Sequence, residues 1–151
     1  MDNQFLFNEF NFILLFLTTS YHWLSTFFEK SQQVSPGNLI DLGGYKVHYC
    51  QKGEGDITVV LDHSLGGIEG YFLMEEIAKI TKVFIYDRPG YGCSDSSPKK
   101  RCSQEIVYEL DQLLPKAEVS PPDLLVGDSF GSYNVRLYAH YFPEKPEFDI
   151  R

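Results

Sequence analysis

The sequence of 151 residues has few cysteines and no cluster of basic residues. Its three cysteines, Cys50, Cys93 and Cys102, match no zinc-ligand spacing, so we expect free thiols, no metal and no disulfide framework. The formal net charge is −8, and no Lys/Arg-rich block interrupts it. Because binding to a phosphate backbone depends on clustered cations, nucleic acid is not an expected partner.

The N-terminus lacks the basic segment of a signal peptide, since Asp2 and Glu9 precede its apolar run over residues 10–28. As a helix, this run would extend about 28 Å, close to the ~30 Å core of a bilayer. Asn11, His22 and several hydroxyl side chains oppose a span. Two interpretations therefore stay open: a membrane anchor, or a helix that lies at an interface or packs on protein.

The chain divides by composition into three parts. Residues 1–30 are expected to form the hydrophobic helix, and residues 31–38, which contain Pro36 and Gly37, a polar linker. The folded domain is expected over residues 39–151. Lys30, directly after the apolar run, favours membrane association with this domain in the cytoplasm.

Strand-like and helical patterns alternate along the domain. Apolar or β-branched runs predict strands, and the first two are separated by a glycine pair that is typical of a tight hairpin. The expected strands are 39–42, 45–49, 57–61, 83–86 and 124–126, and the expected helices are 71–80, 103–115 with Ser103 as N-cap, and 130–141. Short loops between alternating strands and helices predict a three-layer α/β fold with a mostly parallel sheet.

The strongest motif is Gly127-Asp128-Ser129-Phe130-Gly131, which lies between an expected buried strand and an expected helix. A serine in such a turn has a strained backbone, and small residues are needed two positions before and after it. The turn would expose the Ser129 hydroxyl near the free N–H groups that open the helix. This arrangement suits a nucleophile and an oxyanion.

Two further motifs follow the first two buried strands, His63-Ser64-Leu65-Gly66-Gly67 and a turn-rich segment over residues 86–94. Together with the Ser129 motif, in this order and spacing, they resemble the α/β-hydrolase family from about residue 39 to residue 144. The segment over 86–94 is a scaffold, since it lacks the glycine spacing and the lysine of a nucleotide-binding loop. The resemblance implies an esterase, lipase-like or related hydrolytic role, and no cofactor.

The resemblance also assigns roles to individual residues. It implies that Ser129 is the nucleophile and that the backbone N–H groups of Leu65 and Phe130 form the oxyanion hole. Ser64 departs from the glycine usual in the family, which makes the Leu65 donor less certain than that of Phe130. His63 is expected to support the loop rather than to act as a base. Asp128, between the two elbow glycines Gly127 and Gly131, is expected to face solvent or bond the loop.

A base and an acid for Ser129 are not evident. Only His140 follows it, eleven residues along the same expected helix and therefore about 16 Å away. The resemblance ends near Lys145, and the segment containing Asp149 lacks the expected apolar strand. We therefore expect an incomplete domain in which strand 124–126 is an exposed edge, poorly soluble and prone to self-association.

Two functions stay open. The first is a serine hydrolase acting on a small ester-like substrate, with the acid and the histidine supplied by a second chain or by sequence outside these residues. The second is a non-catalytic truncated fragment or a membrane-associated interaction module.

Overall fold

The computed structural model describes residues 3–32, 36–65, 69–120 and 123–145. The chain forms two compact units, Met1–Ser35 and Pro36–Arg151, which we treat separately. The first contains one helix, α1 (Asn3–Gln32). Among the described residues, no helix combines the length and the apolar character that crossing a bilayer requires. The spanning interpretation of residues 10–28 is therefore not borne out, because polar side chains interrupt the run.

The second unit is built on a mixed sheet of five described strands in the order β1-β2-β4-β3-β5. The strands are β1 (Asn38–Asp41), β2 (Lys46–Lys52), β3 (Thr58–Asp62), β4 (Lys82–Tyr86) and β5 (Asp123–Gly127). β2 is antiparallel to both neighbours, whereas β3 is parallel to β4 and β5. Four strands thus share one direction, in agreement with the expected mostly parallel sheet.

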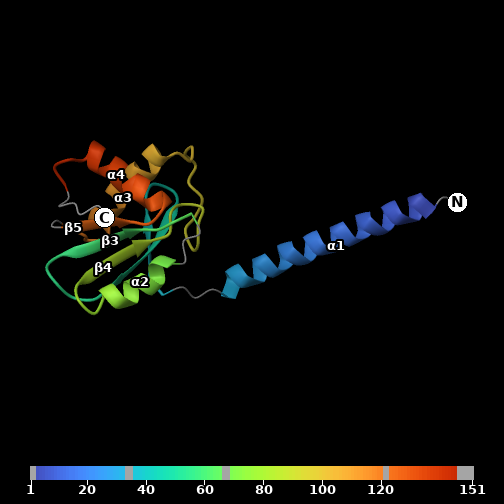
Figure 1. Ribbon diagram of the computed structural model, residues 1–151, viewed down its shortest axis with the longest axis horizontal. Helices are drawn as coiled ribbons and strands as arrows, with labels where there is room; N and C mark the ends of the chain where they lie inside the picture. The colour runs from blue at the N-terminus through green and yellow to red at the C-terminus, as the bar shows by residue number, and fades with distance from the viewer. Residues whose placement is uncertain (1–2, 33–35, 66–68, 121–122, 146–151) are drawn as a thin grey trace. The chain divides into compact units, whose positions relative to one another are not determined.

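Helices cover both faces of this sheet, as Figure 1 shows: α3 (Ser103–Lys116) and α4 (Phe130–Tyr141) on one face, and α2 (Glu69–Ile77) on the other. Successive strand residues point to opposite faces, so β3 contributes Val60 to the core under α3 and α4, and Val59 and Leu61 to the core under α2. The larger core also contains Phe84, Tyr86, Val107, Leu110, Leu113, Leu125, Val135 and Tyr138. The expected three-layer architecture is therefore present.

The hairpin between β1 and β2 forms where the glycine pair predicts it. Gly43 and Gly44 both have positive φ, at 109° and 94°. Their N–H groups donate to the Asp41 carboxylate at 2.6 and 2.8 Å. These two bonds hold the pKa of Asp41 below its ordinary value, since they stabilise the charged form.

Two helix boundaries differ from the sequence-based expectation. The N-cap of α3 is Cys102, which has extended dihedrals, whereas Ser103 is already helical and caps nothing. α2 ends at Ile77 instead of Ile80, because the N–H groups of Lys79 and Ile80 donate three residues back and tighten the chain into the turn before β4.

Candidate active site

The turn between β5 and α4 holds Ser129 in a conformation that is uncommon for a residue with a side chain. Its φ is 51° and its ψ is −111°, and the residue is exposed. Among the described residues, Glu118 is the other non-glycine with positive φ. Strain of this kind is stored where a surrounding structure over-determines the backbone, and it concentrates at functional sites. Asp128 beside it is also exposed, in agreement with the expectation.

The two glycines of the motif lie where no side chain fits. A Cβ on Gly131 would lie 1.9 Å from the carbonyl oxygen of Asp62, and one on Gly127 would lie 2.4 Å from the Ser132 nitrogen. Real Cβ atoms do not approach backbone so closely. The first turn of α4 therefore packs directly on the end of β3, and this contact fixes the direction in which Ser129 leaves the sheet.

The loop after β3 lies beside the Ser129 turn. The Asp128 N–H donates to the Asp62 carbonyl at 3.0 Å, which joins the ends of β5 and β3. Leu65 and Phe130, the two residues expected to donate to an oxyanion, line one hollow of 550 Å³. The structure thus brings these two residues together near the turn. Gly66 and Gly67 of the same motif lie outside the described residues.

Arg88 connects the three segments that meet at the site. It is fully buried; Nη1 donates to Asp62 Oδ1 at 2.6 Å and to the His63 carbonyl at 2.7 Å, and Nη2 donates to the Ser64 carbonyl at 2.6 Å. Its guanidinium also lies 5.3 Å from the ring centroid of Phe130. One side chain from the segment after β4 therefore holds the loop after β3 and contacts the first residue of α4.

Asp62 completes this buried network. Its second carboxylate oxygen accepts a hydrogen bond from Asn134 Nδ2 of α4 at 3.0 Å. Burial raises the pKa of Asp62, whereas Arg88 and Asn134 act to lower it. Sequence analysis missed Asp62, Arg88 and Asn134. A usable signal was present for the first two, because Asp62 directly follows the expected strand 57–61 and Arg88 lies two residues after the expected strand 83–86.

Two described histidines of the domain, His48 and His63, each have one ring nitrogen in contact with a group other than Ser129. His63 is buried, with Nδ1 2.7 Å from the Ser64 carbonyl oxygen and its ring against Tyr86 and Tyr91. Its supporting part in the loop stays a prediction. His140 lies near the C-terminal end of α4, eleven residues beyond Ser129. Asp149, the acid considered from the sequence, lies outside the described residues.

Asp87, in the segment after β4, is the centre of a second polar cluster. Asp87 Oδ2 lies 2.9 Å from His48 Nδ1, and Asp87 Oδ1 accepts from the Tyr71 hydroxyl at 3.0 Å. Ser94 Oγ donates to the Asp87 carbonyl at 2.6 Å. Burial and the nearby Asp87 raise the pKa of Tyr71 above its ordinary value. These contacts hold the segment after β4, which includes Arg88, to β2 and α2.

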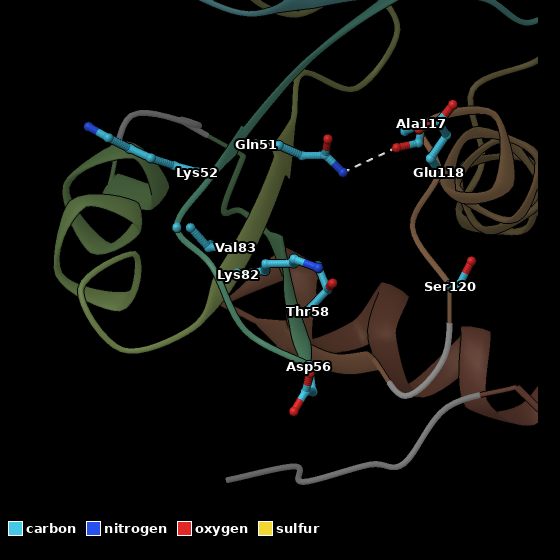
Figure 2. A pocket seen from close by; sticks show the side chains of 10 residues that line it. Gln51, Lys52, Asp56, Thr58, Lys82, Val83, Ala117, Glu118 and Ser120 are labelled. Atoms are coloured by element: carbon cyan, nitrogen blue, oxygen red, sulfur yellow. Dashed lines mark hydrogen bonds between the residues drawn. The ribbon is translucent and has the colours of Figure 1, made fainter.

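A hollow of 450 Å³ lies at the opposite end of the sheet, beside the first residues of β3 and β4, Thr58 and Lys82. Figure 2 shows Gln51 reaching the carbonyl of Ala117, at 3.2 Å, from across this hollow. Lys52 points away and pairs with Glu75. Among its described lining residues there is no histidine or cysteine.

The mixed sheet, its covering helices and the exposed serine between β5 and α4 define an α/β protein with a strained strand-to-helix turn. A family described as alpha/beta hydrolase fold matches residues 57–145, which is more than half of the chain. The chain therefore belongs to the alpha/beta hydrolase fold family.

Similar proteins agree with this assignment. YqjL of Bacillus subtilis (strain 168) is 36% identical over 91 residues, which cover 59% of this chain and 36% of YqjL. The crystal structure of VinJ is 28% identical with a TM-score of 0.64, covering 74% of this chain and 41% of VinJ. Est816, an N-acyl homoserine lactone degrading enzyme, shares the fold at 23% identity and a TM-score of 0.65, over 72% of this chain and 42% of Est816.

These matches share one property. The chain spans 36% of YqjL, 41% of VinJ and 42% of Est816, so it corresponds to less than half of each relative's length.

Proposed function

We propose that Ser129 is the nucleophile of a serine hydrolase that acts on ester or related bonds through an acyl-enzyme. The observation that carries the proposal is the strained, exposed Ser129 at the start of α4, with Gly131 packed against the end of β3. A serine in this turn presents its hydroxyl at the carboxyl end of the strand, next to the N–H groups that open the helix.

In the proposed reaction, a base removes the Ser129 hydroxyl proton while Oγ attacks the carbonyl carbon of the substrate. The N–H groups of Leu65 and Phe130 would stabilise the oxyanion; loss of one such donor typically costs about 3 kcal/mol of barrier. The leaving alcohol takes the proton, and water then releases the acid from Ser129. The 550 Å³ hollow, lined by Leu65, Phe130 and Ile106, offers an apolar place for one side of a small ester-like substrate.

The base and the acid of this reaction are proposed to come from polypeptide outside the described residues. His48 is bound to Asp87, His63 to its own loop, and His140 lies about 16 Å along α4 from Ser129. The matched relatives have more than half of their length beyond the part that this chain covers, which is consistent with a site completed elsewhere.

A second candidate function is a non-catalytic hydrolase-like fragment that acts as an interaction module. The same engagement of the histidines favours it, because a serine without a base is a weak nucleophile. Self-association through the edge of β5, which is the last described strand of the sheet, stays a prediction, as does a cytoplasmic location of the domain.

Labelling with a fluorophosphonate separates the two functions. We expect the full chain to be labelled, Ser129→Ala to abolish labelling, and the exposed Ser96→Ala to leave it unchanged. Circular dichroism of each variant controls for folding. A label that persists in Ser129→Ala would contradict the nucleophile, and a well-folded wild-type chain that takes no label would favour the non-catalytic function.

A further inference from the structure

Helix α1 has a narrow polar stripe. Asn8, Asn11, Thr18, His22 and Ser25 follow one another at steps of three, seven, four and three residues. With 3.6 residues per turn, these positions fall on one side of the helix. Leu15 occupies the one position of this series that is not polar. The stripe thus follows one side of the helix from Asn8 to Ser25 and is interrupted at Leu15.

Apart from Thr19, Ser20 and Thr26, the residues of 10–28 that lie outside the stripe are apolar or aromatic, and many of their side chains are exposed. Large side chains on this side are between 49% and 70% exposed: Phe10, Phe12, Ile13, Leu14, Phe16, Leu17, Leu24 and Phe28. They span about 200°, slightly more than half of the helix circumference, at roughly 100° of rotation per residue. A soluble monomer rarely leaves so large a contiguous apolar area in water, and such areas mark contact with a partner or a lipid surface.

The helix carries no charge that would select a charged partner over this region. Residues 10–28 contain no Asp, Glu, Lys or Arg. The hydroxyls of Thr18, Thr19 and Thr26 donate to carbonyls of their own helix at 2.7–3.0 Å. Because these hydroxyls are hydrogen-bonded within the helix, moving them into a weakly hydrated environment costs less free energy. A basic helix would bind anionic lipid by electrostatic attraction. Residues 10–28 can bind lipid only by burying apolar side chains.

Two amphipathic aromatic side chains border the polar stripe. Tyr21 and Trp23 are 75% and 69% exposed, and they lie about 100° to either side of the stripe near His22. Tyrosine and tryptophan place an apolar ring beside acyl chains and a polar tip in the headgroup region. Their positions mark the two lines along which a helix lying in a membrane surface would meet the headgroups.

We propose that α1 binds in the plane of a neutral lipid surface, with its apolar side inserted among the acyl chains and its polar stripe facing water. Binding is driven by apolar insertion, so it does not require anionic lipid. This proposal is independent of the function proposed for Ser129, because it concerns the other unit of the chain.

Trp23 is the one tryptophan in the sequence, so its fluorescence reports on α1 alone. The full chain, diluted from detergent, is mixed with vesicles of phosphatidylcholine, with or without phosphatidylserine, at low and high salt. We expect neutral vesicles to shift the Trp23 emission to the blue. The partition coefficient should be the same within about threefold at both salt levels. Lipids brominated near the headgroup should quench the emission more than lipids brominated near the chain end. Binding that requires phosphatidylserine would overturn the proposal, as would a shift already complete without lipid.

Paired variants test the orientation of the helix. Ile13→Glu and Leu24→Glu place a charge on the apolar side, whereas Asn11→Glu and His22→Glu place the same charge on the polar stripe two residues away. The first pair is expected to lower the partition coefficient by about tenfold or more, and the second by less than about threefold. Equal losses in both pairs would contradict an in-plane helix. A lipid-independent cross-linked oligomer that buries Trp23 would identify a protein partner instead and overturn the proposal.

Discussion

Arg88 is the residue that connects most of the described site. It is buried, it pairs with Asp62, and it donates to two successive carbonyls of the loop after β3. The planar guanidinium suits this arrangement because it presents several donors in a fixed geometry, which a lysine cannot do. The position of Leu65, three residues beyond Asp62, therefore depends on the Arg88 side chain.

Removing Arg88 should destabilise the fold. Arg88→Leu leaves the Asp62 carboxylate buried without its cation, so we expect the free energy of unfolding to fall by about 3–5 kcal/mol. Arg136→Leu is the matched control, because Arg136 is exposed on α4 and its loss should change stability by less than about 0.5 kcal/mol. Urea unfolding followed by circular dichroism measures both. A change below about 1 kcal/mol for Arg88→Leu would show that the buried pair contributes little.

For individual residues, the sequence predicted those that belong to a local motif. It did not predict those that come together only when the chain packs. The spacing of Gly127, Ser129 and Gly131 is local, so it is visible in one segment of sequence. Asp62, Arg88 and Asn134 are far apart in sequence, and only the parallel pairing of β3 with its neighbours brings them together. No local pattern contains that pairing.

At the scale of secondary-structure elements, the junction of β5 with α4 contains the Ser129 motif. α4 begins one residue after the strained serine and immediately packs on the end of β3, with Gly131 at the contact. The approach is close enough to exclude a methyl group. The close approach of α4 to the end of β3 therefore depends on the absence of a side chain at residue 131.

Two glycine variants isolate this effect. Gly131 and Gly70 both lie in helices, where alanine gains up to about 1 kcal/mol in propensity. A Cβ at 131 would meet the Asp62 carbonyl at 1.9 Å, whereas one at 70 meets the flexible end of Ile85 at 2.5 Å. We expect Gly131→Ala to lower the free energy of unfolding by about 1–3 kcal/mol or more and Gly70→Ala to be near neutral. Equal urea midpoints for the two variants would contradict the close contact.

Element identities followed from the sequence more reliably than element ends did. The strands and helices of the domain appear where periodicity predicts them, because buried faces impose that periodicity. The ends depend on contacts that arise only after packing. α2 stops at Ile77 because the chain must turn into β4, and the extended backbone of Cys102 makes it the N-cap of α3 although Ser103 is the better capping residue.

At the scale of the whole domain, several buried groups share a direction of pKa change. Burial raises the pKa values of Tyr45, Tyr71 and Tyr86 above the ordinary tyrosine value of 10.0, and that of Cys50 above the ordinary cysteine value of 9.0. In the unfolded chain these groups lose their protons near the ordinary values. Above those values, the folded state therefore binds more protons than the unfolded state.

The sign of the resulting pH dependence follows directly. The stability should be fully present below about pH 9 and should fall as the pH rises further, by up to about 1.4 kcal/mol per pH unit for Tyr86. Tyr86→Phe should make the decline shallower, whereas Tyr133→Phe, at an exposed position, should not. Urea midpoints between pH 7 and 11 measure this, and a flat profile would contradict burial of these groups.

One hydrogen bond described above bears on how the site is lost. The Asp128 N–H donates to the Asp62 carbonyl, so the turn that holds Ser129 cannot open while β3, Arg88 and α4 keep their positions. The strained serine is therefore part of the same cooperative unit as the core of the domain. On heating, its geometry should persist until that unit melts and then disappear in the same transition, without a softer intermediate in which the sheet survives and the elbow is lost.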